Sequence, residues 1–174
     1  MSLQDIKNSI RNVPDFPKQG IQFKDITTAI KQPKILKETL EMMAEHYKNQ
    51  QIDYVVGVES RGFIFGAALA YMLGCGFIPV RKKGKLPAEV LSQEYSLEYG
   101  TDKIEIHKDA LNKGDKVLIV DDLLATGGTT QATVELIKKT SADIIGFAFM
   151  IELDDLNGRA ILNKTAEVFS LVHY

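Results

Sequence analysis

The segment VLIVDDLLATGGTT, residues 117–130, changes character twice along its length. It begins with the apolar, β-branched run of a buried strand, continues with Asp121 and Asp122, and ends in small residues that lead into a helical pattern. A strand buried on both faces is typical of a parallel α/β sheet, in which ligands bind beyond the carboxyl ends of the strands. The segment therefore predicts that both carboxylates lie at a ligand-binding edge.

The rest of the chain repeats the alternation of strand and helix. Further apolar runs of the strand type occupy residues 53–59, 76–81, 144–151 and 167–172. Helical patterns lie between or before them, at residues 33–49, 62–73 and 129–139. This alternation implies right-handed crossovers and an α/β fold with an open, mainly parallel sheet flanked by helices. A length of 174 residues fits one domain, so we expect residues 1–174 to form a single domain.

Two stretches do not fit the alternation. Residues 12–28 carry two prolines and a glycine among aromatic residues, and we expect them to be ordered but irregular. Residues 82–109 begin with KKGKLP and continue with alternating apolar and polar residues, which predicts a hairpin projecting from the sheet. Structureless loops of this length in a compact domain are usually functional or disordered.

Residues 63–80 contain no charged side chain and approach the length of a membrane-spanning helix. Glycines and Pro79 interrupt the run, which splits it into a small-residue helix and a short strand. We therefore expect a core helix and strand, with no membrane partner.

The composition limits the cellular compartment and the classes of binding partner that we expect. The formal net charge of −2 provides no general basic field for nucleic acid, so any anion site must be local. Cys75 is the only cysteine, which excludes an internal disulfide and a thiolate zinc cluster and suits a reducing compartment. The N-terminal residues are polar and lack the apolar region of a secretory signal. We expect a cytoplasmic protein without a nucleic-acid partner.

Residues 125–130 have the features of a phosphate cradle. Backbone N–H groups at a helix N-terminus carry positive partial charge, and Gly127 and Gly128 allow an anion to approach closely. Thr126 and Thr129 add hydroxyl donors. Asp121 and Asp122 would repel the same phosphate, but vicinal sugar hydroxyls can donate to them, so the segment fits a ribose 5-phosphate. The residues alone also allow an exposed aspartate pair beside a helix N-cap.

Motifs along nearly the whole chain carry a family resemblance. They are FPKQGIQFKDIT (16–27), SRGFIFG (60–66), RKKGKLP (81–87), YSLEYG (95–100) and VDDLLATGGT (120–129). The last resembles the ribose-phosphate signature of the type I phosphoribosyltransferases, and together they resemble the adenine phosphoribosyltransferases of that family. The resemblance implies the type I phosphoribosyltransferase fold, with an N-terminal hood at about 1–30 and a mobile catalytic loop at about 82–109.

The resemblance also implies an activity in purine salvage. The 5-phosphoribosyl group would pass from 5-phosphoribosyl 1-diphosphate to adenine N9, giving AMP and diphosphate. Magnesium would be carried mainly by the diphosphate, since the sequence offers no cluster of protein ligands for it. A homodimer is implied as well. The family's ribose-phosphate site would comprise Asp121, Asp122, Ala125, Thr126, Gly127, Gly128 and Thr129.

Arg61 is the first candidate for the leaving diphosphate. It follows the strand at 53–59 and offers a planar fork of donors, with Ser60 beside it. The alternative for Arg61 is a surface salt bridge. The resemblance implies a cis peptide between Glu59 and Ser60.

The basic cluster RKKGK, residues 81–85, is a second candidate for the diphosphate. Its position after a strand favours that role, and the resemblance favours Arg81 and Lys85 within it. By charge alone the cluster could equally be a solvated loop.

The mobile loop carries the residues nearest the chemistry. The resemblance places Glu98 near the base, as a proton acceptor or as a charge that stabilises a cationic transition state, with Tyr99 next to it among the binding residues. Without the resemblance, Glu98 would be one of several exposed carboxylates on a hairpin.

The base site is implied by the hood. Phe23 would pack on the purine, main-chain groups from Gln22 to Lys24 would read its edge, and Leu153 would form the opposite apolar wall. Lys24 stands where the family usually has arginine, and Glu59 where it usually has aspartate.

Two other functions remain open. The chain could use hypoxanthine, guanine or xanthine in place of adenine, or it could bind 5-phosphoribosyl 1-diphosphate as a sensor without catalysis. The hood and Glu98 argue against the first. The intact loop and the lack of room for a DNA-binding domain argue against the second.

Overall fold

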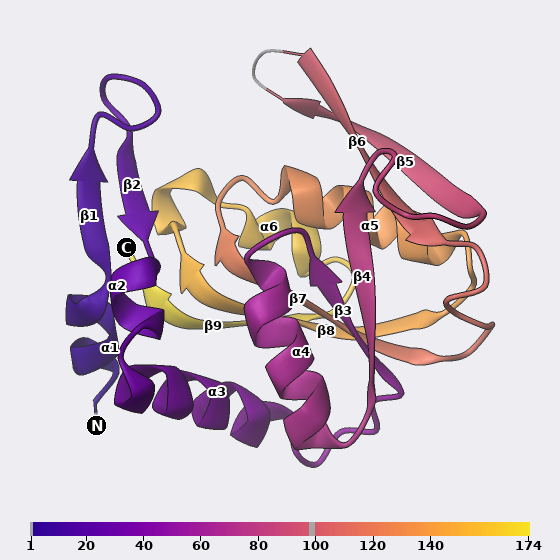
Figure 1. Cartoon of the computed structure of the whole chain (residues 1–174), viewed down its shortest axis with the longest axis horizontal. Helices are drawn as coiled ribbons and strands as arrows, with labels where there is room; N and C mark the ends of the chain where they lie inside the picture. Colours follow the sequence, from indigo (N-terminus) through magenta and orange to yellow (C-terminus); the bar gives the residue numbers. More distant parts are fainter. Residues whose placement is uncertain (1, 98–99) are drawn as a thin grey trace.

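The computed structural model of the chain describes residues 2–97 and 100–174. Its centre is a set of five parallel strands, in the spatial order β4, β3, β7, β8, β9 (Figure 1). These strands are β3 (Tyr54–Val58), β4 (Gly76–Lys82), β7 (Lys116–Leu124), β8 (Asp143–Glu152) and β9 (Glu167–His173). Each of the five apolar runs is therefore a strand, and the predicted fold class is confirmed.

The strand order places a ligand-binding crevice between β3 and β7. From β3 the chain crosses through α4 (Gly62–Leu73) to β4 on one side, whereas β7 crosses through α5 (Gly128–Lys138) to β8 on the other. The connections thus diverge at the β3–β7 boundary, the topological switch point at which open α/β sheets bind their ligands.

The helices cover both faces of the sheet, which explains why the strands are apolar throughout. Val55 belongs to a core shared with α3 (Pro33–Tyr47) and α4, while its neighbour Val56 belongs to a second core shared with α5 and α6 (Arg159–Leu162). The hydroxyl of the fully buried Tyr47 donates to the Phe147 carbonyl across 2.8 Å, which ties α3 to the sheet.

The N-terminal segment is more regular than the sequence predicted. Helix α1 (Leu3–Ser9) precedes an antiparallel pair, β1 (Arg11–Pro14) and β2 (Gln22–Asp25), and the short helix α2 (Thr27–Ile30) follows. The expectation of an irregular segment at 12–28 was wrong because its prolines fall where they do not interrupt the pairing. Pro14 ends β1, and Pro17 lies in the connecting loop after a cis peptide bond.

The expected hairpin at 82–109 is present as β5 (Val90–Leu97) and β6 (Gly100–His107). Strand β6 pairs antiparallel with the end of β4, so the hairpin extends the sheet. It then projects away from the edge of the sheet on the side of α5 (Figure 1). It packs against α5 through β5.

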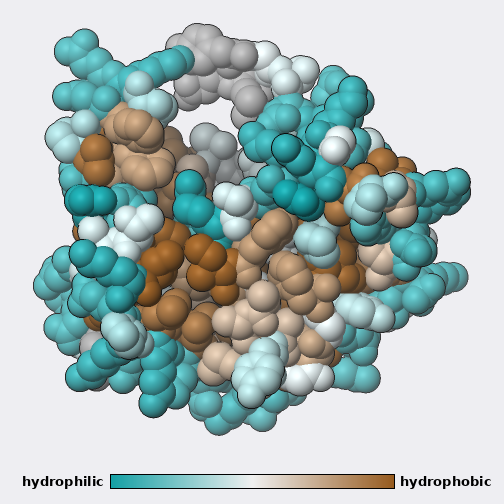
Figure 2. Space-filling model, viewed as in Figure 1, coloured by the Kyte–Doolittle hydropathy of each residue, from teal (hydrophilic) through white to brown (hydrophobic). Residues whose placement is uncertain are grey.

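Helix α4 has an outward side that remains apolar. Ile64, Tyr71 and Met72 are exposed, Tyr71 by 88%. Figure 2 shows this largely apolar surface in the middle of the face where α4 lies in Figure 1. The prediction of a core helix and strand within 63–80 is confirmed by α4 and β4. None of the helices in the described ranges combines the length and the apolar character that crossing a bilayer requires.

Candidate active site

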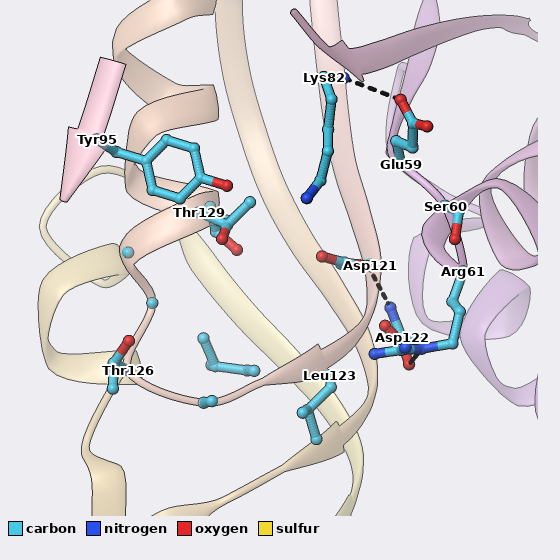
Figure 3. A pocket seen from close by; sticks show the side chains of 15 residues that line it. Glu59, Ser60, Arg61, Lys82, Tyr95, Asp121, Asp122, Leu123, Thr126 and Thr129 are labelled. Carbon is cyan, nitrogen blue, oxygen red and sulfur yellow. Dashed lines mark hydrogen bonds and ion pairs between the residues drawn. The ribbon is translucent and has the colours of Figure 1, made fainter. Parts of the chain in front are cut away.

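A cavity of about 480 Å³ opens at the carboxyl ends of β3 and β7 (Figure 3). It is lined by residues 59–61, by Lys82 and Tyr95, and by residues 121–130. The carboxyl ends of β3 and β7 and the segments after them therefore meet at one cavity, at the sheet edge where the sequence predicts a ligand.

Arg61 connects the two segments. The peptide between Glu59 and Ser60 is cis, as expected, and Arg61 follows directly before α4 begins. The Arg61 guanidinium donates through Nε to the Asp122 carboxylate, whose side chain is 5% exposed, while the Arg61 side chain is 45% exposed. Partial burial alone would lower the pKa of Arg61, but the hydrogen bond to Asp122 and the negative charges of nearby aspartates together outweigh this and raise the pKa. The arginine therefore remains charged and half open to the cavity.

Asp121 and Asp122 have unequal surroundings. Asp122 is compensated by Arg61, whereas the Asp121 side chain accepts one hydrogen bond from the Asp122 backbone N–H at 2.8 Å. Burial, and then the negative charge of Asp122, raise the pKa of Asp121 well above the usual aspartate range. Figure 3 shows Asp121 near the middle of the cavity. It is the carboxylate with the greater need for hydrogen-bond donors from a ligand.

Residues 125–130, which the sequence predicts to be a phosphate cradle, lead into the N-terminus of α5. Gly127 takes the left-handed conformation, with φ of 84°, and α5 begins at Gly128. The Gly127 carbonyl accepts from the Gln131 N–H at 2.8 Å, so the N–H groups of the first turn remain directed beyond the helix end. Thr129 and Thr130 line the cavity beside these groups.

Two glycines outside residues 125–130, Gly62 and Gly158, allow other segments to pack closely against the cavity wall. A Cβ on Gly62 would lie 2.9 Å from Asp121 Oδ1 and from the Val120 carbonyl oxygen. A Cβ on Gly158 would lie 2.3 Å from the Ala125 carbonyl oxygen. Asn157 and Gly158 together signal a turn, but the sequence does not say which distant segment a glycine will contact, so neither contact was foreseeable without the fold.

The members of the basic cluster at residues 81–85 have different surroundings. Arg81 donates through Nε to Glu59 Oε2 at 3.2 Å and through Nη1 to the Lys85 carbonyl at 3.3 Å. Burial alone would raise the pKa of Glu59, but bonds from the Lys82 N–H and Arg81 outweigh it and lower the pKa. Arg81 and Lys85 therefore lie next to Glu59, outside the described cavity lining.

Lys82 is the member of the basic cluster that lines the cavity, whereas the resemblance favoured Arg81 and Lys85. Its Nζ lies 3.2 Å from Asp102 Oδ2 on β6. The Tyr95 hydroxyl from β5 also contacts Asp102, at 3.3 Å, and lies near Thr129 (Figure 3). Side chains alternate across a strand, so only the register decides that Lys82 and not Arg81 faces the cavity.

The hood reaches the site through Phe23. The Arg61 guanidinium lies over the Phe23 ring at 5.7 Å, and Phe16 packs edge-on against that ring. Lys24 instead donates to Asn12 and lies over the Tyr174 ring, and Gln22 accepts from Asn12. Leu153 packs at the margin of the core that contains α3 and α4. Glu98 and Tyr99 lie outside the described residues.

One group of carboxylates and a histidine in the described ranges is close enough to hold a metal, and it lies away from the cavity. It consists of Glu152, Asp154 and His173. Its Glu152 is already bound by Arg159. The cavity itself offers Asp121 and Asp122 as oxygen ligands.

Comparison with known proteins places the chain in a family. A model described as "Phosphoribosyl transferase domain" matches residues 27–170. The adenine phosphoribosyltransferase of Acaryochloris marina is 56% identical over 98% of the chain and 99% of its own length. The chain belongs to the adenine phosphoribosyltransferase family.

Solved structures of adenine phosphoribosyltransferases have the same fold. That of Thermoanaerobacter pseudethanolicus is 50% identical, covers 99% of this chain and 100% of its own, and superposes with a TM-score of 0.95. That of Saccharomyces cerevisiae, complexed with adenine and an imino-altritol bisphosphate, is 42% identical with a TM-score of 0.91, and 98% of each chain is covered.

Proposed function

We propose that this chain transfers the 5-phosphoribosyl group of 5-phosphoribosyl 1-diphosphate to N9 of adenine, giving AMP and diphosphate in purine salvage. The observation that carries the proposal is the cavity at the β3–β7 switch point, in which a carboxylate pair stands directly before a helix N-terminus. The identity of more than half of all residues with an adenine phosphoribosyltransferase supports the choice of base.

The phosphoribosyl group would bind along residues 121–129. Its 5-phosphate would accept from the backbone N–H groups of Ala125 to Thr129 and from the Thr126 and Thr129 hydroxyls. Its ribose hydroxyls would donate to Asp121 and Asp122. The raised pKa of Asp121 supports this assignment, because sugar hydroxyls would supply donors that its surroundings lack.

The leaving diphosphate would lie on the opposite wall. Positive charge develops on the anomeric carbon as negative charge develops on the diphosphate, so fixed cations on the diphosphate side lower the barrier. Arg61 and Ser60 would contact the diphosphate, and Lys82 faces the same space. Arg81 and Lys85 would contact the diphosphate only after Arg81 breaks its hydrogen bond to Glu59.

A metal-dependent reaction is consistent with the family, and we propose magnesium as the ion. Mg²⁺ commonly binds one or two carboxylates together with substrate phosphates and water, which fits a cavity with two adjacent aspartates. Bound with the diphosphate, it would neutralise charge on the leaving group. The ion would be held mainly by the diphosphate, by sugar hydroxyls and by water, because Asp122 is paired with Arg61.

Adenine would bind beneath the hood. Phe23 would pack on its face, main-chain groups of Gln22 to Lys24 would read its edge, and Leu153 would close the other side. Glu98 and Tyr99 would approach from the loop, Glu98 as proton acceptor or stabilising charge. The contact between Arg61 and Phe23 supports placing the base next to the leaving-group site.

We further propose a cytoplasmic homodimer whose chain acts as a single domain, with a hood at about 1–30 and a mobile loop at about 82–109. The exposed apolar side of α4 supports self-association, because monomeric proteins rarely leave such contiguous surface uncovered.

Steady-state AMP formation tests the choice of base. The purified chain, with magnesium and 5-phosphoribosyl 1-diphosphate, would be offered adenine, hypoxanthine, guanine and xanthine separately. We expect turnover with adenine alone. Turnover with another base would replace the proposed substrate, and diphosphate-sugar binding without turnover on any base would favour a sensor.

A further inference from the structure

A partly buried ion pair outside the cavity holds the segment that lies beneath residues 125–128. Glu152, the last residue of β8, is 3% exposed and accepts from Arg159 Nε at 2.9 Å and from Arg159 Nη2. Arg159 also donates through Nη1 to the Val168 carbonyl of β9. Arg159 thus joins the start of α6 to the ends of two strands.

The residue before Arg159 touches the cradle directly. Gly158 lies so close to the loop that its absent Cβ would stand 2.3 Å from the Ala125 carbonyl oxygen and 2.9 Å from the Gly127 nitrogen. On the other side, a Cβ on Gly127 would lie 3.1 Å from the Gly158 carbonyl oxygen. The backbone at Gly158 therefore forms the floor of the loop formed by residues 125–128.

The ion pair fixes that floor relative to the strand that carries the loop. In the sheet register Glu152 is the partner of Leu124, the residue immediately before the loop, and the Leu153 N–H donates to the Leu124 carbonyl at 2.9 Å. Glu152 is thus held beside the start of the loop by the pairing of β7 and β8. Arg159 follows directly after Gly158, which forms the floor of the loop. The bidentate pairing of Glu152 and Arg159 closes a rigid ring around residues 125–128.

We propose that Arg159 and Glu152 are positioning residues for the 5-phosphate, acting through Gly158 on the backbone N–H groups of the loop. This inference rests on the proposed function and adds to it the source of the loop's rigidity. An anion site built from backbone N–H groups depends on their mutual geometry, so a shift of the floor weakens phosphate binding specifically. The pairing lowers the pKa of Glu152, against the opposing effect of its burial, and keeps the carboxylate ionised.

The test measures how much the 5-phosphate adds to binding. Isothermal titration calorimetry would give the dissociation constants of AMP and of adenosine, whose ratio isolates the contribution of the phosphate. The variants are Arg159→Lys, which keeps the charge and loses the fork, and the double variant Arg159→Met with Glu152→Gln, which removes the pair without leaving a buried charge. We expect the dissociation constant of adenosine divided by that of AMP to fall about tenfold or more in both variants.

Two controls separate positioning from general destabilisation. Met43→Ala creates a cavity in the core beneath α3, so it lowers Tm but should leave the ratio unchanged. Diphosphate, which does not use the loop, should bind the Arg159→Lys variant as it binds the native chain.

The outcomes separate this inference from the proposed function. If the native chain forms AMP but the ratio stays native in both Arg159 variants, or falls equally in Met43→Ala, the positioning role is wrong and the proposed function stands. If the native chain binds diphosphate but neither forms nor binds AMP, the proposed function fails, and this inference fails with it.

Discussion

At the scale of single residues, Asp121 and Asp122 are adjacent in sequence yet differ in what compensates their charge. Arg61 neutralises Asp122, and Asp121 is left with one backbone donor and the repulsion of its neighbour. A partly buried carboxylate that no cation hydrogen-bonds costs stability in the free protein, even with the charge of Arg61 nearby. A ligand with two hydroxyls would remove part of that cost. The free protein is therefore less stable than it would be without this carboxylate, and ligand binding recovers part of the difference, as is common at functional sites.

This arrangement predicts opposite effects of Asp121→Asn on stability and activity. The pKa of folded Asp121 lies above that of the unfolded chain, so the folded state binds the extra proton and stability falls as pH rises between the two values. The asparagine side chain of the variant does not ionise, so the variant does not lose stability in this way as pH rises. We expect its Tm to exceed the native value by roughly 3 °C near neutral pH, and the difference to vanish at about pH 3.

AMP formation by Asp121→Asn should fall about 100-fold, since the amide accepts from the ribose hydroxyls through one neutral oxygen in place of two charged ones. Thermal unfolding across this pH range and steady-state kinetics would check both results. A variant that is less stable than the native chain near neutral pH would show that the ionised Asp121 is already compensated.

At the scale of elements, the sequence predicted the five parallel strands, the three main helices and the hairpin, because strong apolar periodicity decides them. The cradle was predictable too, since Gly127, Gly128 and the threonines lie together in the chain. The β1–β2 pair was not, because prolines obscure a short strand pair whose register depends on packing. Contacts made by Gly62, Lys82 and Gly158 depend on register and on segments far apart in sequence.

The approach of α4 to β7 gives a prediction at this scale. Gly62→Ala would place a methyl group 2.9 Å from the Val120 carbonyl oxygen, which belongs to the central strand and cannot move aside. We expect a loss of about 1–3 kcal/mol in the free energy of unfolding, from overpacking. The helix carries Arg61 at its start, so the KM for 5-phosphoribosyl 1-diphosphate should rise as well.

Urea unfolding and kinetics would measure these effects, with Lys37→Ala on the exposed side of α3 as the control, because the exposed side of α4 is the proposed dimer interface. The control should lose about 0.5 kcal/mol at most and keep the native KM. Equal behaviour of the two variants would mean that α4 can shift without disturbing the site.

At the scale of the whole molecule, the apolar side of α4 predicts the assembly state. Replacing Tyr71 and Met72 together by Asp places two charges on this surface, and burying them in an interface would cost far more than leaving them in water. We expect light scattering after size exclusion to give a dimer for the native chain and a monomer for the double variant. Leu3→Asp, on the exposed side of α1, should remain dimeric.

A native chain that is monomeric at micromolar concentration would contradict the proposed homodimer. A double variant that remains dimeric would place the interface elsewhere on the molecule.

The central claim is a coupled transfer at the β3–β7 cavity, and product stoichiometry tests it most directly. With magnesium and 5-phosphoribosyl 1-diphosphate, AMP and diphosphate would be quantified together, in the presence and absence of adenine. We predict equal amounts of both with adenine and almost no diphosphate without it. Diphosphate released without matching AMP would identify a hydrolase, and the absence of both products despite substrate binding would contradict catalysis.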